Sequence, residues 1–435
     1  MATLDFHSLL DGGSAGEFQA PAAPSGRELQ ELLSPISCEE FVNSYFSRVS
    51  LSVAGNPGKF DHIFGWERLK RALARGKTIQ DKSHNITASF ASGEDSASSD
   101  EMISAGHDQV SDLLSAGATI CISNIHMADP LLAEWANAIR AQLGFSGTVG
   151  VHCYVSPDNS GLPMHFDRRI ATTLQIAGKK RWKYSTESAK TWPNDNGVYK
   201  QGKADLVWLD SGKLPAEMEF REVELHPGDV LCLPAGAWHA ARGVGFSLAL
   251  NLYFAPRNFY LQLAPLIQEM AAASGAWRGG PPATLERAQG KMPQVVKAYM
   301  RERLEEFHQK ALQLIEDPDA LAEPWLNSLA FDPYTGWQPF TNVGLPKVTP
   351  SQRFRVAPSS LNFIEIKGQL VVPSDYGALR FPATFAPILR RISSEAAGFS
   401  IPELLSWQQG AGGSSQEEII SHLGMLYKSG LVRPA

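Results

Sequence analysis

The sequence predicts an α+β protein whose centre is an antiparallel β-barrel or β-sandwich. Between residues 147 and 256, short apolar runs alternate with turns of Gly, Pro, Asp and Asn, a spacing typical of such folds. On both sides of this region the apolar residues recur at helical spacing instead. A length of 435 residues is enough for about two to three domains.

Charge and hydropathy exclude several classes of protein. The net charge of −6 argues against a general nucleic-acid binder, which usually carries a strongly basic domain. No run approaches the roughly 18 apolar residues of a membrane helix, and no basic segment followed by an apolar stretch marks a secretory signal. The four cysteines lie far apart, as is typical of reduced thiols. We therefore expect a cytoplasmic protein that binds neither membranes nor DNA.

The region before the barrel is expected to be mainly helical. Residues 1–35 are rich in Gly, Ala, Ser and Pro and predict a flexible N-terminal arm. Ser37 is placed to cap a helix that follows it. The further expectations are a helix over 66–76, a polar loop over 92–101, a helix, a turn and a buried strand over 109–125, and a helix over 130–144.

The region after the barrel divides into two parts. Residues 257–330 predict long amphipathic helices whose apolar stripes are too extensive for one barrel to cover, so we expect a homodimer through them. Residues 331–435 predict a small sheet, three helices and a closing strand, an order that resembles a winged helix. Residues 356–435 hold six basic and six acidic side chains, which favours protein contact over DNA binding.

A candidate metal site lies within the barrel segment. On a strand, His165 and Asp167 would point to the same face, and His239 follows 74 positions later, after a Pro-Gly-Asp turn. Two histidines and one carboxylate form the facial triad that leaves open positions on Fe(II). A lone His-x-Asp also arises by chance, and His165 would then be a core histidine. The order of the surrounding motifs favours the metal.

Lys180 is a candidate anion-binding residue. Alternation along the strand places Lys180 and Trp182 on one face, and Lys179 and Arg181 on the other. A lysine on the inward face of a barrel requires an anionic partner, because a buried unpaired charge is costly. The alternative is that Lys179, Lys180 and Arg181 form a solvated basic turn.

Four motifs in this order carry a resemblance to a known family. They are YVSPDNSGLPMHFD, LQIAGKKRW, LHPGDVLCLPAGAWH and LALNLYF. Residues 36–256 resemble the JmjC branch of the cupin-fold Fe(II)/2-oxoglutarate oxygenases, and among these the ribosomal-protein hydroxylases, or ribosomal oxygenases. The resemblance implies a double-stranded β-helix (cupin or jelly-roll) catalytic core. It also implies that 257–330 is a helical dimerisation domain and 331–435 a winged-helix-like domain.

The resemblance also implies roles for individual residues. His165, Asp167 and His239 match the Fe(II) ligands, and Lys180 matches the residue that pairs with the distal carboxylate of 2-oxoglutarate. Tyr154 matches a tyrosine that binds the same carboxylate, although core packing would explain it equally. Asn251 matches a polar residue near the 1-carboxylate, and a polar side chain in an apolar strand needs a partner in any case.

The implied activity is hydroxylation of an amino-acid side chain in a protein or peptide, with 2-oxoglutarate and O2 converted to succinate and CO2. The alternatives are a peptide or small-molecule natural-product precursor as substrate, N-methyl-lysine demethylation, and a non-catalytic metal-binding cupin. The sequence departs from the family at Arg168 and Arg169, which follow the His-x-Asp motif. If either reaches the mouth of the site, we expect a substrate that is acidic or carries a carboxylate; the alternative is a pair of structural rim arginines. The insertion at 188–220 is expected to form a lid or barrel rim.

Overall fold

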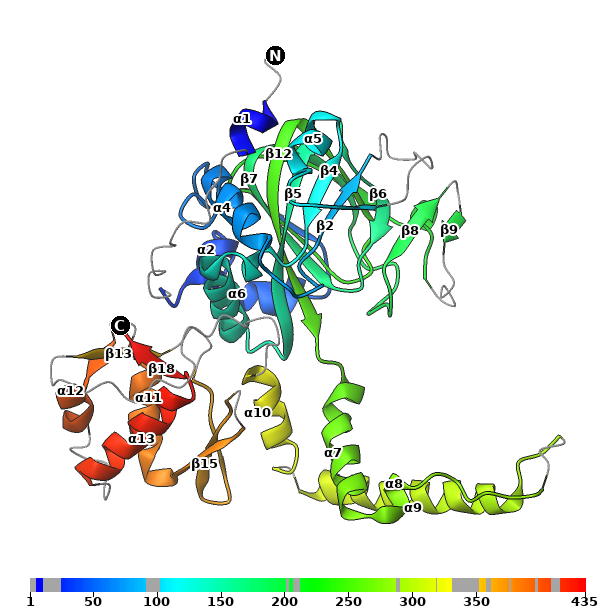
Figure 1. Cartoon of the computed structure of the whole chain (residues 1–435), viewed down its shortest axis with the longest axis vertical. Coiled ribbons are helices and arrows are strands. Elements are labelled where there is room, and N and C mark those ends of the chain that lie inside the picture. The colour runs from blue at the N-terminus through cyan, green and yellow to red at the C-terminus, as the bar shows by residue number, and fades with distance from the viewer. Residues whose placement is uncertain are drawn as a thin grey trace.

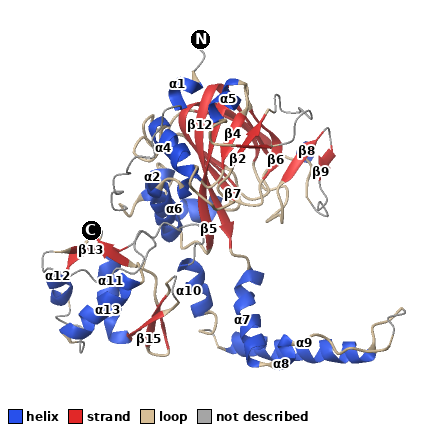
Figure 2. Ribbon diagram, viewed as in Figure 1, coloured by secondary structure: helices blue, strands red, loops and turns tan. Residues whose placement is uncertain are grey.

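The structure is a computed structural model, and most of the chain is described in it (Figures 1 and 2). The described residues are 5–10, 25–90, 102–200, 203–205, 212–286, 290–317, 319–330, 352–356, 361–374, 377–395, 398–407 and 415–435. The polar loop expected at 92–101 lies outside them, and so does the stretch 331–351 after the predicted domain boundary.

A twelve-stranded antiparallel sheet forms the centre of the molecule, as predicted. The main path of the sheet runs in the order β1-β11-β7-β12-β5-β4-β2-β3, and β10, β6, β8 and β9 attach beside it. The strands are β1 (Leu51–Val53), β2 (Ile86–Ser89), β3 (Ile103–Ala105), β4 (Thr119–Ile122), β5 (Gly147–Pro157), β6 (Gly161–Phe166), β7 (Ile170–Ser185), β8 (Gly197–Lys200), β9 (Lys203–Asp205), β10 (Phe220–Leu225), β11 (Val230–Leu233) and β12 (His239–Pro256).

The two longest strands organise the sheet. β12 pairs with β5 along one edge and with β7 and β6 along the other. β7 is continuous, and Gly178, with φ of 63°, absorbs the irregularity in the β12–β7 register. β8 and β9 come from the insertion at 188–220 and extend the sheet beside β6, so the described part of that insertion forms part of the rim.

Helices cover the sheet on the side away from β8 and β9 (Figure 1). α4 (Trp66–Gly76) and α6 (Pro130–Gln142) match the predicted helices, and the shorter α5 (Val110–Ser115) precedes β4. Asp129 caps α6 by accepting from the backbone N–H groups of Leu131 and Leu132, and Pro130 occupies the first turn. Arg68 of α4 forms an ion pair with this fully buried carboxylate. The pair ties the two helices together beneath the sheet.

The described parts of the N-terminal region, 5–10 and 25–35, differ from the flexible arm predicted for 1–35. Phe6–Leu10 (α1) and Glu28–Leu33 (α2) are short helices whose apolar side chains are buried in the core of the sheet domain. In the described parts of this segment, 5–10 and 25–35, apolar side chains therefore pack into the core. Ser37 caps the next helix, as predicted, by accepting from the N–H of Glu40. That helix, α3 (Cys38–Glu40), continues as a π-helix over Phe41–Tyr45.

The helical segment after β12 projects away from the sheet domain (Figure 1). It contains α7 (Phe259–Ala273), α8 (Gly275–Arg278), α9 (Gln294–Glu316) and α10 (Ala322–Ala330). α7 leads out from the end of β12, α8 and α9 lie across its far end, and α10 returns towards the C-terminal region. α9 has no buried residue. None of the described helices combines the length and the apolar character needed to cross a bilayer.

The C-terminal region has a core of its own, formed by residues such as Phe354, Phe385 and Leu423. The single small sheet predicted here is instead two three-stranded sheets, β17-β13-β18 and β14-β15-β16. The elements are β13 (Arg353–Val356), β14 (Ile364–Ile366), β15 (Gln369–Val372), β16 (Leu379–Pro382), α11 (Ala386–Ser394), β17 (Phe399–Ser400), α12 (Ile401–Ser406), α13 (Gln416–Lys428) and β18 (Val432–Pro434).

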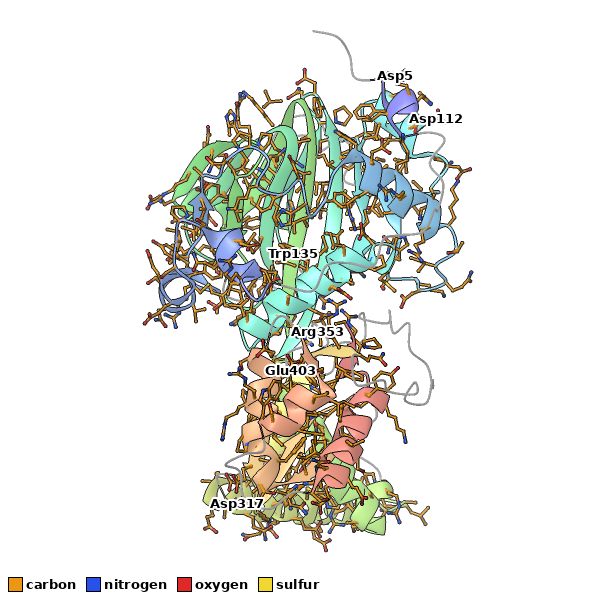
Figure 3. The ribbon with its side chains drawn as sticks, turned by 90° about the vertical axis from the view of Figure 1, so that its left-hand side faces the viewer. Asp5, Asp112, Trp135, Asp317, Arg353 and Glu403 are labelled. Carbon is orange, nitrogen blue, oxygen red and sulfur yellow. The ribbon has the colours of Figure 1, made fainter. Side chains whose placement is uncertain are left out.

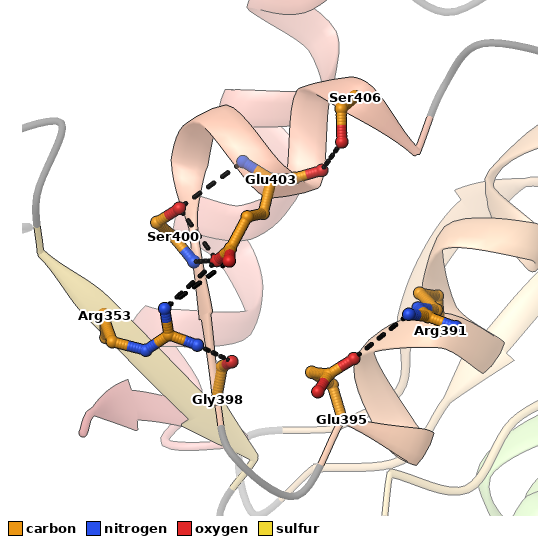
Figure 4. A network of polar contacts seen from close by, with 7 residues as sticks. All are labelled: Arg353, Arg391, Glu395, Gly398, Ser400, Glu403 and Ser406. Atoms are coloured by element: carbon orange, nitrogen blue, oxygen red, sulfur yellow. Dashed lines mark hydrogen bonds and ion pairs between the residues drawn. The ribbon is translucent and has the colours of Figure 1, made fainter.

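Polar contacts stabilise the C-terminal region internally and attach it to the sheet domain. Ser400 and Glu403 form a capping box at the start of α12, and Arg353 of β13 reaches the same carboxylate at 3.3 Å (Figure 4). The region lies beneath α6, near Trp135 (Figure 3). Arg433 of β18 pairs with Glu134 of α6 at 2.6 Å, and both side chains are mostly buried. The C-terminal strand is therefore fastened directly to the helix that supports the sheet.

Candidate functional site

Strand register brings the two predicted histidine ligands together. His239 is the first residue of β12 and lies opposite His165 of β6 and opposite Tyr184 of β7. The His165 and His239 rings have centroids 4.1 Å apart. Trp238, which is fully buried, packs edge-on against Phe166 on the other face of the strands. Because side chains alternate along a strand, this packing turns both imidazoles to the same side.

Asp167 completes a cluster of three possible metal ligands. It lies immediately after β6, rather than within the strand as the sequence suggested. One carboxylate oxygen lies 3.8 Å from Nε2 of His239. One donor atom from each of His165, Asp167 and His239 lies within 4.8 Å of the other two, and no other such group of three is found among the described residues. The backbone carbonyl of Asp167 accepts from the N–H of Gly236, which ties it to the turn before β12.

Backbone contacts set the tautomers of both histidines. Nδ1 of His165 lies 2.8 Å from the carbonyl of Pro163, and Nδ1 of His239 lies 2.9 Å from that of Ala237. A carbonyl accepts only, so each Nδ1 carries the proton and each Nε2 keeps its lone pair. Burial, followed by the neighbouring His165, lowers the pKa of His239. Neutral imidazoles with free Nε2 atoms are the form that binds a metal ion.

Lys180 is buried in the barrel, as its alternation with Trp182 predicted. Its side chain is 4% exposed, whereas Lys179 and Arg181 on the opposite face reach Glu224 at the surface. The Lys180 ammonium donates to Oγ of Ser156 at 3.2 Å, and no carboxylate among the described residues pairs with it. Burial lowers the pKa of Lys180 to about 8. Among the described residues, this buried cation therefore has no counter-ion.

A small cavity joins Lys180 to the three metal-ligand candidates. Its described lining residues are Tyr154, Leu162, His165, Asp167, Thr173, Lys180, Trp182, His239, Ala241, Ala249 and Asn251. Two buried polar atoms in this lining, Oδ1 of Asn251 and Nε1 of Trp182, have no hydrogen-bond partner in the described part of the chain. Buried polar groups are nearly always satisfied, so an acceptor, a donor and a cation left open in one cavity indicate a polar, anionic ligand.

A second, larger cavity of about 580 Å³ opens beside the same cluster. His165 and Asp167 line both cavities, as do Tyr154, Leu162 and Asn251. Arg168 and Arg169, singled out in the sequence, both line the larger cavity. The site is therefore double: an inner cavity with Lys180 and an outer one with the two arginines, sharing the candidate ligands at their junction.

Sequence reasoning missed a group of residues in the larger cavity. Tyr253 donates from its hydroxyl to Oδ1 of Asn124 at 2.7 Å, and the N–H of Asn124 donates to Nδ1 of His152 at 3.0 Å. The Tyr253 and His152 rings stack with centroids 4.6 Å apart. Burial, followed by nearby Arg169, lowers the pKa of His152 to about 3. His152 does lie in the same strand as Tyr154, two positions earlier, and this shared face was the available signal.

Comparison with known proteins identifies a family that resembles the central part of the chain. The family described as the JmjC domain matches residues 131–260. This matched segment resembles a JmjC domain. It begins in α6, includes β5 to β12 and ends at the start of α7, so it covers His165, Asp167, Lys180 and His239.

Curated relatives match about half of the chain at low identity. An uncharacterised Bacillus subtilis protein, YxbC, is 24% identical over 258 residues, which cover 56% of this chain and 75% of the relative. Ribosomal oxygenase 1 of Gallus gallus is 25% identical over 255 residues, covering 55% of this chain and 39% of the relative. An Aedes aegypti protein named bifunctional lysine-specific demethylase and histidyl-hydroxylase NO66 is 24% identical, with 37% of its length covered. The chain thus spans less than half of these last two relatives.

Solved structures resemble the chain well beyond the residues that match the JmjC family. The Escherichia coli ribosomal oxygenase YcfD superposes with a TM-score of 0.54 at 12% identity, covering 92% of this chain and 98% of that one. A structure of YcfD in complex with cobalt and 2-oxoglutarate gives a TM-score of 0.53 at 13% identity. At such identity the likeness establishes the JmjC, cupin-type fold.

Proposed function

We propose that the chain is an Fe(II)- and 2-oxoglutarate-dependent oxygenase that hydroxylates an amino-acid side chain in a protein or peptide. The reaction takes up 2-oxoglutarate, O2 and a C–H bond of the substrate and yields succinate, CO2 and a C–OH group. The observation that carries the proposal is the inner cavity, where two imidazoles, a carboxylate and an unpaired buried lysine meet. Relatives named as ribosomal oxygenases support the same reaction class.

In this proposal His165, Asp167 and His239 hold the metal. Two neutral imidazoles and one carboxylate are the donor set that suits Fe(II) with positions left open for other ligands, so the residues present fit the ion. Bound iron would supply the activation of O2, which protein side chains cannot perform. The carbonyls of Pro163 and Ala237 keep both Nε2 lone pairs turned towards the ion.

Lys180, Tyr154 and Asn251 would hold 2-oxoglutarate. A cation in a barrel interior suits the distal carboxylate, because a charge-assisted contact there replaces an uncompensated buried charge. The Lys180 ammonium lies 5.5 Å from the centroid of the Tyr154 ring, so both residues border the same space. Asn251, whose Oδ1 lacks a partner, lies on β12 between the two cavities.

The experiment that tests the activity follows two products. The purified chain, Fe(II), 2-oxoglutarate and a peptide pool from the source proteome should yield succinate together with peptides heavier by about one oxygen atom, and His165→Ala should abolish both. Formaldehyde release from methyl-lysine peptides would instead favour a demethylase. Hydroxylation confined to a small-molecule precursor would favour the natural-product alternative. No succinate from the wild-type protein under any of these conditions would leave only a non-catalytic metal-binding cupin.

The same proposal assigns a role to each part of the chain. Residues 36–256 form the catalytic domain of a cytoplasmic enzyme, 257–330 mediate homodimerisation, and 331–435 form a winged-helix-like domain that contacts protein rather than DNA. The exposed apolar side chains of the helical segment support the second assignment, since Phe259 and Tyr260 are each 68% exposed. Light scattering at micromolar concentration should give the mass of a dimer, and a monomer would refute this assignment.

A further inference from the structure

We infer that the outer cavity selects a substrate side chain that carries a carboxylate, an aspartate or glutamate, and that Arg169 is the residue that recognises it. This inference rests on the proposed function, because it places the substrate beside the metal-ligand candidates. Three observations support it: the charges that line the cavity, the support beneath Arg169, and the free donors around it.

The charges lining the outer cavity favour an anion. Arg168 and Arg169 both face this space, and Asp167 is the only carboxylate among its described lining residues. Asp167 is already committed to the metal-ligand cluster. An arginine or methyl-lysine substrate would meet two positive charges and no free negative one there. A carboxylate would meet two guanidinium groups, whose forked donors match its geometry.

Arg169 is held in place without being neutralised. Its guanidinium carbon lies 4.6 Å from the centroid of the Tyr253 ring. Tyr253 is fixed in turn by its hydrogen bond to Asn124 and by its stacking on His152. No ion pair or hydrogen bond of the Arg169 side chain occurs within the described residues, so its donors stay available. A structural rim arginine would have a carboxylate or carbonyl partner. Arg169 instead lies over the face of the Tyr253 ring.

A neighbour of Arg169 supplies a further hydrogen-bond donor for a bound carboxylate. Nδ1 of His152 accepts from the N–H of Asn124, so a neutral His152 carries its proton on Nε2 and can donate it. His152 is partly exposed and lines the same cavity. Arg169 follows the candidate ligand Asp167 by two residues, which keeps a bound carboxylate close to the metal cluster. The substrate carbon next to that carboxylate would then lie at the junction of the two cavities.

The negative net charge of the chain means that long-range attraction cannot explain a preference for acidic peptides. With a net charge of −6, the protein as a whole repels acidic peptides at long range. A preference for acidic side chains must therefore arise from a local group of positive charges. Arg221 on β10 provides the matched control, because it is exposed and lies outside the outer cavity.

The test is selection from a displayed random heptapeptide library on the full-length protein, with Mn(II) and 2-oxoglutarate present and O2 excluded. We expect Asp or Glu to be enriched about tenfold over Lys and Arg at one position, as a charge-assisted contact would give. Arg169→Gln should remove this enrichment, Arg169→Lys should retain part of it, and Arg169→Glu should replace it with Lys or Arg. Arg221→Glu should leave the wild-type pattern unchanged.

Two results would overturn the inference. The first is that the wild-type protein enriches neutral or basic residues, or shows no charge preference at all. The second is that an acidic preference survives in Arg169→Glu. Manganese content and 2-oxoglutarate binding are measured on the same samples. Normal binding of both without acidic selection would mean that this inference fails alone. Failure to bind either one would count against the proposed function, whatever peptides are selected.

Discussion

Replacing Lys180 with methionine separates a functional role of this residue from a structural one. In the free protein the ammonium is buried with no counter-ion among the described residues, and its pKa falls from about 10.5 to about 8. That difference corresponds to roughly 3 kcal/mol against the charged form at neutral pH. Lys180→Met removes this cost and loses a hydrogen bond to Ser156 worth about 1 kcal/mol. The ligand-free variant should therefore be more stable than the wild type.

The same substitution should weaken 2-oxoglutarate binding. Truncating one partner of a buried charge pair costs about 2–4 kcal/mol, because the other charge is left unpaired. At 1.4 kcal/mol per factor of ten, the dissociation constant should rise about 30- to 700-fold. Calorimetric titration of 2-oxoglutarate into the manganese-loaded protein measures this change, and thermal unfolding of the metal-free protein measures the stability. The expected Tm rises by about 2–4 °C for each kcal/mol gained.

Lys179→Met is the control for this experiment. Lys179 precedes Lys180 in β7 but faces outward, 45% exposed, with Glu224 3.5 Å away. Exposed ion pairs contribute about 0–1 kcal/mol, so neither the stability nor the binding should change appreciably. A Lys180→Met protein that unfolds at lower temperature and binds 2-oxoglutarate as the wild type does would refute the reasoning. Lys180 would then be a structural residue.

Four further results are expected. Because Lys180 must be protonated to pair with a carboxylate, 2-oxoglutarate affinity should be constant below pH 8 and fall by up to about tenfold per pH unit above it. Lys180→Arg should remove this fall. A wild-type affinity that does not fall above pH 8 would exclude the assignment. The ligand-free protein should gain stability between pH 8 and about 10.5, since over that range the unfolded chain binds more protons at Lys180 than the folded one. Arg68→Ala leaves the fully buried carboxylate of Asp129 unpaired and should lower the free energy of unfolding by about 3 kcal/mol in chemical denaturation; a change below about 1 kcal/mol would mean that the pair does not support α6. Leu304→Glu together with Ile315→Glu places charges on one exposed face of α9 and should convert a dimer to a monomer in light scattering, while a dimer that persists would place the interface elsewhere.

Local alternation and motif order were sufficient to predict much of the site. The two-residue period along β7 correctly separated buried Lys180 and Trp182 from exposed Lys179 and Arg181. The His-x-Asp motif and the distal histidine predicted a cluster that the strand register assembles. These features depend on neighbouring residues or on one strand pairing, which a sequence can reveal.

Features that depend on several strand pairings could not be predicted. The support for Arg169 joins Asn124, His152 and Tyr253, and its central hydrogen bond spans 129 positions of the chain. It forms only because β5 and β7 both flank β12. Composition also misled at the N-terminus, where a few apolar residues such as Phe6 and Leu33 reach the core. The small sheet predicted for the C-terminal region divides in two for a similar reason, since strand partners are chosen by tertiary packing.

Metal-dependent binding of 2-oxoglutarate tests the central claim most directly. Anaerobic calorimetry would titrate 2-oxoglutarate into the Fe(II)-loaded chain, into the metal-free chain and into Asp167→Ala treated with Fe(II). The account predicts one 2-oxoglutarate per chain in the first sample and binding at least about tenfold weaker in the other two, because an open position on the metal completes the site. Equal affinity in all three samples would contradict it, because 2-oxoglutarate would then bind without the metal cluster.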